Sequence, residues 1–247
     1  MSLSKWLLAT ALASSTLAQA VPIVNLFELG VAAGKNADYQ AVGEHNITTS
    51  IADEDGTLAM YSVRSKADAN LAYMFEIYAD EAAYQAHLQS PQYQAFLQAA
   101  PNILTDHKQK TELVPRFLGD KKIAPGADTR TNLVVVEVKP QFNQDFYRLV
   151  SAEMQQSLQA ENGVLAMYAA TAKNAPQRWY FFEIYADEAA YQRHRQTPHF
   201  QHYLQNSSAM VQDKQFIQIQ PMLLGNKGYL NFQAAPPQSE ATQEYSK

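Results

Sequence analysis

The chain has 247 residues, enough for one large domain or two smaller ones, since a domain takes about 100–200 residues. Hydrophobic residues make up 47% and charged residues 17%, so a substantial core can form, and wholesale disorder and collagen-like structure are excluded. The net charge of −5 argues against a dedicated nucleic-acid binder, and the absence of cysteine excludes disulfides, thiolate metal sites, iron–sulfur clusters and cysteine nucleophiles.

The first twenty residues have the pattern of a secretory signal peptide. Lys5 supplies a short positive start, residues 6–12 are mostly apolar, and small residues follow up to Ala18-Gln19-Ala20. The apolar stretch of about a dozen residues is shorter than the ~20 needed to span a bilayer, so we expect cleavage after Ala20. Residues 1–20 therefore predict an exported protein, periplasmic or secreted, without a stable membrane anchor.

The remaining chain contains an internal duplication. Residues 75–85 and 182–192 both read FEIYADEAAYQ, at an offset of 107. A repeat of this length far exceeds a solenoid unit, so it indicates a duplicated domain. We expect a first domain over residues 21–118 and a second over 131–226, here called the first and second repeats, joined by a polar linker over 119–130. Residues 227–247 are expected to form a mobile tail.

Each repeat shows the same order of predicted elements. An apolar, β-branched strand is followed by an amphipathic helix, two further strands, a second helix and a last strand. The first, third and last strands are expected over residues 23–31, 71–78 and 109–117, and over 132–138, 178–185 and 215–223. The residues that bound these elements also recur. Each repeat has a turn glycine, an Asp N-cap and a Ser/Thr-Pro pair that restarts the second helix (Gly56, Asp80 and Ser90-Pro91; Gly163, Asp187 and Thr197-Pro198). The order βαββαβ is that of a ferredoxin-like unit, so the predicted fold class is α+β.

The third strand is apolar on both of its faces. In the second repeat, one face carries Tyr180, Phe182 and Ile184, and the other carries Trp179, Phe181 and Tyr185. A sheet that is buried on both sides has this pattern. We therefore expect one face to meet a partner sheet and the other to meet the helices.

Several short motifs resemble those of the antibiotic biosynthesis monooxygenase (ABM) domain family. They are a glycine before a Leu-x-Met strand, an E-x-Y strand end, a D-E-A-A helix start, and a His followed by T-P-H-F (Gly163, Leu165, Glu183, Tyr185, Asp187, His194 and Thr197-Pro198-His199-Phe200). Relatives include quinol monooxygenases, autoinducer-processing enzymes and haem-degrading monooxygenases. The resemblance covers both repeats, nearly all of residues 23–225. Since family members are usually homodimers with a shared α/β barrel, it implies that the repeats build this barrel within one chain, as a pseudo-dimeric monomer.

The resemblance also places a pocket between sheet and helices in each repeat. The candidate catalytic residues there are Glu183, Tyr185 and His194 in the second repeat, and Glu76, Tyr78 and His87 in the first. The Glu and Tyr of each strand share a face, and burial of that carboxylate would raise its pKa and make it a proton acceptor. A Glu–His pair could then hold a substrate hydroxyl. The alternative is that the pair only ties the strand to a helix.

The second repeat is richer in aromatic and histidine residues around its expected pocket. The candidate substrate-binding residues are Trp179, Phe181, Met167, His199, Asn132 and Asn25. A metal site of His194, His199 and His202 is the alternative, but we expect none, because zinc usually requires three fixed ligands and a surface helix can carry two histidines without a role. The register of the first strand stays open, since an offset of 107 pairs Asn25 with Asn132 and one of 109 pairs Glu28 with Glu137.

The function that the resemblance implies is a monooxygenase without a cofactor. Because no flavin, nicotinamide or iron–sulfur motif appears, we expect a small aromatic or quinone-like substrate to supply the electrons to O₂. Two alternatives remain: a non-catalytic periplasmic binding or stress protein for a hydrophobic ligand, and haem binding. Haem-degrading relatives use an Asn, a Trp and a His, whereas this chain has Tyr78 and Tyr185 at the matching tryptophan position.

Overall fold

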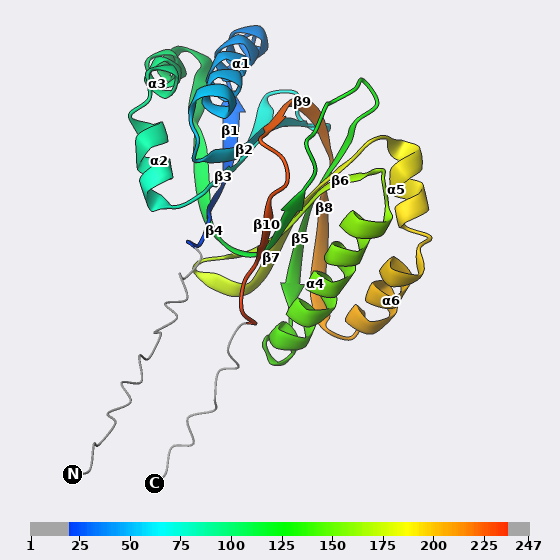
Figure 1. Ribbon diagram of the computed structural model, residues 1–247. Coiled ribbons are helices and arrows are strands. Elements are labelled where there is room, and N and C mark those ends of the chain that lie inside the picture. The colour runs from blue at the N-terminus through cyan, green and yellow to red at the C-terminus, as the bar shows by residue number, and fades with distance from the viewer. Residues whose placement is uncertain (1–19, 237–247) are drawn as a thin grey trace, which may run out of the picture.

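The computed structural model describes residues 20–236, in which the two repeats form the same series of elements (Figure 1). The first repeat contains β1 (Ile23–Val31), α1 (Asn36–Asp53), β2 (Thr57–Ser65), β3 (Leu71–Tyr78), α2 (Glu81–Leu88), α3 (Pro91–Ile103) and β4 (Leu104–Asp120). The second contains β5 (Arg130–Val138), the 3₁₀ turn η1 (Pro140–Phe142), α4 (Asn143–Ala160), β6 (Val164–Ala172), β7 (Ala175–Tyr185), α5 (Glu188–His194), α6 (Pro198–Ser207), β8 (Val211–Ile217) and β9 (Ile219–Asn226). A short strand, β10 (Asn231–Gln233), follows. The predicted α+β class and the two ferredoxin-like repeats are confirmed.

The break between the last two helices of each repeat arises from the predicted capping residues. Asp80 accepts a hydrogen bond from the backbone N–H of Ala83 at the start of α2. The Ser90 hydroxyl then accepts from the N–H of Tyr93, with Pro91 at the first position of α3. Asp187 and Thr197 cap α5 and α6 in the same way. Each of these four helices thus begins where a side-chain oxygen satisfies an N–H group that lacks a partner within the helix.

The two repeats share their last strands, and this closes the barrel. β4 pairs with β1 of its own repeat along its first half and with β6 of the other repeat along its second half. In the same way β8 pairs with β5, and β9, which follows after Gln218, pairs with β2. The sheet order β8-β5-β7-β6-β4-β1-β3-β2-β9 therefore returns to the same stretch of chain. This is the expected pseudo-dimeric barrel within one chain, and closure leaves few free strand edges.

The last strands are longer than predicted. β4 spans Leu104–Asp120 rather than residues 109–117, and β8 and β9 together extend beyond 215–223. The first half of β4 and most of β8 carry exposed polar side chains, so their sequence lacks the apolar alternation that identifies a strand. They are strands because their backbones pair with β1 and β5, a tertiary cause that local pattern does not contain.

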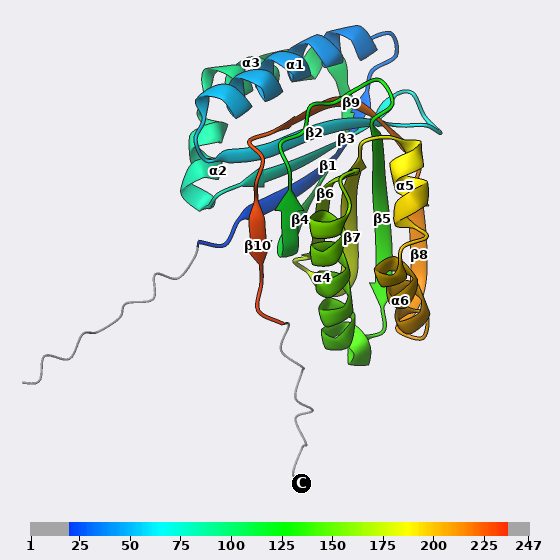
Figure 2. The ribbon, with the colours of Figure 1, turned by 45° about the vertical axis from the view of Figure 1, so that its right-hand side comes forward.

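The barrel interior and the helix side are separate apolar clusters, as the two faces of the third strand predicted. Phe182 and Ile184 lie in the interior cluster, whereas Trp179, Phe181 and Tyr185 pack beneath the helices. Figure 2 shows α1–α3 covering the first repeat's strands on one outer side and α4–α6 covering the second repeat's strands on another. Each repeat therefore has its own layer between sheet and helices, where the pockets lie.

The linker and tail are more structured than the sequence suggested. Gly119 and Asp120 belong to β4 and pair with β6, so they do not belong to the expected 119–130 linker. Within the expected 227–247 tail, β10 pairs with β4 and Phe232 is buried in the interior cluster. The Asp120 carboxylate accepts a hydrogen bond from the Leu230 N–H, which holds the segment before β10 against the end of β4. Strand β10 has only three residues, which is too short for an alternating pattern to predict it.

The expected signal peptide over residues 1–20 and the end of the tail, residues 237–247, lie almost wholly outside the described residues. Within residues 20–236, no helix is both long and apolar enough to span a membrane.

Substitution of Phe232 tests whether β10 is part of the folded unit. Phe232→Ala should lower the free energy of unfolding by about 3 kcal/mol, because it removes a buried aromatic ring and leaves a cavity. The adjacent Asn231 is exposed on the same strand, so Asn231→Ala should change stability by less than about 0.5 kcal/mol. Chemical denaturation measures both, and equal effects of the two substitutions would contradict the assignment.

Candidate active site and histidine cluster

Each repeat has a pocket between its sheet and its helices, at equivalent positions. The two hollows measure about 500 Å³ in the first repeat and 490 Å³ in the second, part of each being open to solvent. The first is lined by Phe27, Leu29, Tyr39, Gly43, Asn46, Ile47, Ser62, Met74, Glu76, Tyr93 and Phe96. The second is lined by Val134, Val136, Val150, Glu153, Met154, Phe181, Glu183, Tyr191, Phe200, Tyr203, Lys214 and Phe216. Most lining positions correspond at the offset of 107, so the duplication produced two versions of one site.

The first pocket holds one carboxylate in apolar surroundings. Glu76 projects from β3, and one of its oxygens accepts a hydrogen bond from the Tyr78 hydroxyl at 2.8 Å. Burial raises the pKa of Glu76 to about 7, although the Tyr78 hydrogen bond and the charge of Lys110 act in the opposite direction. Near neutral pH this carboxyl therefore exists both as an acid and as a base, which suits it to exchange a proton with a ligand.

Two polar atoms close to Glu76 have no hydrogen-bond partner among the described residues. Asn25 lies directly opposite Glu76 in the β1–β3 pairing, and its buried Nδ2 is unpaired. The Oδ1 of Asn46, a residue that lines the pocket, is also buried and unpaired. Unsatisfied buried polar atoms are costly, and a polar ligand is one way to satisfy them. The register settles the open alternative for the first strand, because Asn132 stands opposite Glu183 in the same way, at an offset of 107.

The second pocket differs in the state of its strand carboxylate. One oxygen of Glu183 accepts hydrogen bonds from both Asn132 Nδ2, at 3.0 Å, and the Tyr185 hydroxyl, at 2.9 Å. A second carboxyl group, that of Glu153 on α4, also lines this pocket, together with Lys214. Burial raises the pKa of Glu153 to about 8, and the nearby charges of Glu183 and Glu161 add to the increase. The second pocket therefore contains more ionisable side chains than the first.

The histidines do not pair with the strand carboxylates, contrary to the expected Glu–His pair. His87 Nδ1 lies 3.0 Å from Glu54 at the end of α1, and His194 Nδ1 lies 3.0 Å from Glu161, which follows α4. Each histidine ring instead packs against the tyrosine of the E-x-Y strand end, 5.2 and 5.3 Å from it between centroids. Neither histidine lines its pocket, and neither does the tyrosine on which it packs, since all four side chains are buried in the core. Glu54 and Glu161 were missed, although they too match at the offset of 107.

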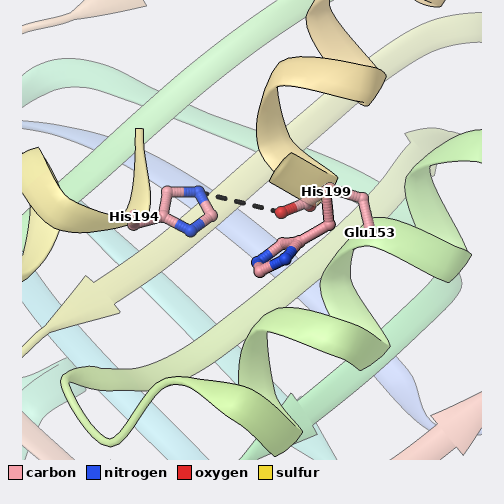
Figure 3. A group of neighbouring side chains, drawn as sticks. All are labelled: Glu153, His194 and His199. Atoms are coloured by element: carbon pink, nitrogen blue, oxygen red, sulfur yellow. Dashed lines mark ion pairs between the residues drawn. The ribbon is translucent and has the colours of Figure 1, made fainter. Parts of the chain in front are cut away.

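The histidines of α6 divide between cluster and surface. His199 Nε2 lies 2.7 Å from Glu161, so Glu161 contacts both His194 and His199. The His194 Nε2 faces Glu153 at 3.8 Å (Figure 3). His202, which the sequence suggested as a third histidine of this group, is exposed and interacts with Asn206. The group that the structure brings together is therefore two histidines and two glutamates.

Two of the other candidates belong to the core and one lines the pocket. Trp179 is fully buried, donates its Nε1–H to Asn143 and packs edge-on against Phe146, so it belongs to the core and not to the pocket wall. Met167 is likewise buried in the core beneath the helices. Phe181 does line the second pocket, as predicted. The Ala72 that replaces Trp179 in the first repeat shows that the ring fills space specific to the second repeat.

The comparisons with known proteins agree with this architecture. The family described as antibiotic biosynthesis monooxygenase matches residues 22–99 and 130–206, more than half of the chain. A “putative monooxygenase” from Lactobacillus acidophilus is 27% identical, with a TM-score of 0.82 over 86% of this chain and 99% of its own. Another from Fusobacterium nucleatum is 26% identical, with a TM-score of 0.82 over 87% and 99%. No curated protein matches. The chain belongs to the antibiotic biosynthesis monooxygenase family, as a tandem duplication of its domain.

Proposed function

We propose that the chain is a cofactor-independent monooxygenase that oxidises a small quinol, or a similar electron-rich aromatic, in the pocket of the first repeat. The observation that carries this proposal is Glu76, a buried carboxyl group in an apolar pocket whose pKa is raised to about 7. A general base is most effective when its pKa lies near the working pH. Family membership supplies the reaction class, and this carboxyl supplies a group that can begin the reaction.

The lining of the first pocket suits an aromatic ring with two hydroxyl groups. Phe27, Tyr93 and Phe96 offer ring faces and edges, and aromatic contacts contribute about 0.5–1.5 kcal/mol each beyond burial. Glu76 and the unpaired Oδ1 of Asn46 are two separate acceptors in the same pocket. A ligand with hydroxyl donors at two positions would satisfy both, and this favours a quinol over a simple hydrocarbon.

The first repeat is the better site, although the sequence favoured the second for its tryptophan and histidines. In the second pocket, one oxygen of Glu183 already accepts two hydrogen bonds, so that oxygen is less available to the hydroxyl group of a ligand. Trp179 is buried in the core and cannot stack on a ligand there. Glu76, by contrast, has a single hydrogen-bond donor in Tyr78.

The reaction proceeds by proton transfer followed by electron transfer to O₂. Ionised Glu76 removes a proton from the quinol hydroxyl, and the resulting anion gives one electron to O₂ to form superoxide and a ring radical. The two recombine to form a C–O bond, and the O–O bond then breaks. One oxygen atom stays on the ring and the other leaves as water, so a quinol and O₂ yield a hydroxyquinone and water. The apolar walls of the pocket favour this sequence by excluding bulk water.

Oxygen uptake by the metal-stripped protein with a panel of reduced quinols tests the proposal. Glu76→Gln should lower the rate above autoxidation by about 100-fold or more, since general base catalysis contributes about 10²–10⁴-fold. The matched variant in the second repeat, Glu183→Gln, should keep most of the rate. If Glu183→Gln lost the oxygen uptake and Glu76→Gln kept it, the assignment to the first pocket would be contradicted. The absence of uptake by the folded wild-type protein with every quinol would contradict the proposed reaction.

The state of Glu76 can also be tested without a substrate. Because burial raises its pKa to about 7 in the folded chain, above the value of 4.5 for an exposed glutamate, ionisation of Glu76 removes stability as the pH rises from about 4.5 to 7. Glu76→Gln removes this dependence. The free energy of unfolding of the variant, relative to that of the wild type, should therefore be up to about 3 kcal/mol higher at pH 8 than at pH 4.5. Chemical denaturation at both pH values measures the difference. An equal effect at the two pH values would show that the pKa of Glu76 is not raised.

A further inference from the structure

A second site, separate from the first pocket, lies among α4, α5 and α6 of the second repeat. Glu153 comes from α4, His194 from the end of α5 and His199 from the first turn of α6 (Figure 3). One ligand-type atom from each side chain lies within 4.8 Å of the other two. The His194 Nε2 is 3.8 Å from a Glu153 oxygen, within the about 4.2 Å that two ligands can span across one ion. A small rotation of these side chains would bring all three to bonding distance.

Glu161 orients both histidines for this role. One of its oxygens contacts His194 Nδ1 at 3.0 Å and His199 Nε2 at 2.7 Å. As a carboxylate it accepts an N–H hydrogen bond from each ring, and in a neutral imidazole this leaves the other nitrogen with a free lone pair. A carboxylate that fixes histidine tautomers in this way is the usual outer partner of a metal-bound histidine.

The first repeat provides an internal comparison. Three residues of the cluster have identical counterparts there. His194, Glu161 and Ser157 correspond to His87, Glu54 and Ser50. The two positions that would complete a ligand set differ, because Asn46 stands for Glu153 and Gln92 stands for His199. There the buried His87 Nε2 has no partner among the described residues. The second repeat therefore differs at the two positions that place a carboxylate and an imidazole beside this nitrogen.

The charge of the cluster favours a cation. Two carboxyl groups face the His194 ring, with Glu153 3.8 Å from its Nε2 and Glu161 3.0 Å from its Nδ1. Among residues 20–236, no lysine or arginine side chain forms an ion pair with Glu153 or Glu161; the ion pairs of both glutamates are with histidine. A divalent ion would supply the missing positive charge where the carboxylates are partly desolvated.

A path from solvent reaches the cluster. A surface groove between α4 and α6 is lined by Glu153 and His199, with Gln156, Pro198 and the exposed His202 along it. An ion entering through this groove meets two of the three side chains directly, and water can complete its coordination from the same side. Two imidazoles and a carboxylate, with positions left for water, suit zinc and the neighbouring first-row divalent ions better than calcium or magnesium.

We propose that the second repeat binds one divalent transition-metal ion of the zinc class through His194 Nε2, a ring nitrogen of His199 and the carboxylate of Glu153, with Glu161 as the positioning residue. The site goes beyond the proposed reaction, which uses the other repeat. The ion would occupy the wall shared by the second pocket and the α4–α6 groove, since Glu153 lines both.

Metal titration of the full chain, prepared without a histidine tag and treated with a chelator, tests the proposal. Zn²⁺ binding is followed by calorimetry, and Co²⁺ binding by its visible absorption, which reports nitrogen and oxygen ligands around the ion. Wild-type protein should bind one ion per chain. Glu153→Asn/His199→Gln, which copies the first repeat, should lose saturable binding, and Glu161→Gln should bind one ion about 10–100-fold more weakly.

The matched control is Asn46→Ala/Gln92→Ala, which alters the equivalent positions of the first repeat and should still bind one ion. Thermal unfolding confirms that each variant is folded, and His199→Gln alone serves if the double variant is not. No saturable binding by the wild-type protein, or unchanged binding by the folded Glu153 and His199 variants, would overturn the proposal. Because the quinol test uses metal-stripped protein and the Glu76 variant, each proposal can fail while the other stands.

Discussion

The exchange of last strands between the two repeats is the constraint on which the rest of the structure depends. β4 must pair with β1 and then with β6, and β8–β9 must pair with β5 and then with β2. Neither sheet is complete without the other, so the repeats cannot separate without breaking both ladders. The exchange turns one face of every central strand into a shared interior and leaves the other face for the helices. Both pockets lie on that second face because the first is filled.

The interior is nearly symmetric, and this explains where the repeats were able to diverge. Tyr61 and Tyr168, which correspond at the offset of 107, share a hydrogen bond of 2.7 Å across the centre of the barrel. Phe75 and Phe182 stack beside them at 4.9 Å between centroids. Each ring packs on its own counterpart, so a change in one repeat would also disturb the other. On the helix side, Trp179 packs on Phe146 and Phe181 of its own repeat, and His199 contacts Glu161 of its own repeat. These positions could therefore differ from their counterparts, Ala72 and Gln92, without that cost.

The sequence was sufficient for the fold but only partly for the site. An eleven-residue identity and repeated caps predicted two ferredoxin-like units, and strand β3 was predicted to the residue. The polar half of β4 and the return of β10 were missed, because their pairing depends on distant strands. The strand glutamates and their tyrosines were predicted as neighbours by alternation, and the structure joins them. The partners of the histidines were not predicted. Glu54 and Glu161 follow α1 and α4, far in sequence from the histidines of α2 and α5, and only the offset of 107 connects the two glutamates.

Fusion into one chain allows the two pockets to carry different chemistry. In a homodimer each pocket has the same residues, so a carboxylate added to one appears in both. Here the first pocket keeps Glu76 among apolar side chains, where burial is the main cause that raises its pKa to about 7. If Glu153 had an equivalent beside Glu76, its charge would raise that pKa further and leave less of the base ionised at neutral pH. The proposed proton transfer by a lone carboxylate and the proposed binding of a cation by a carboxylate–histidine cluster therefore have opposing requirements. A duplicated chain can meet both, because Asn46 stands in one repeat where Glu153 stands in the other.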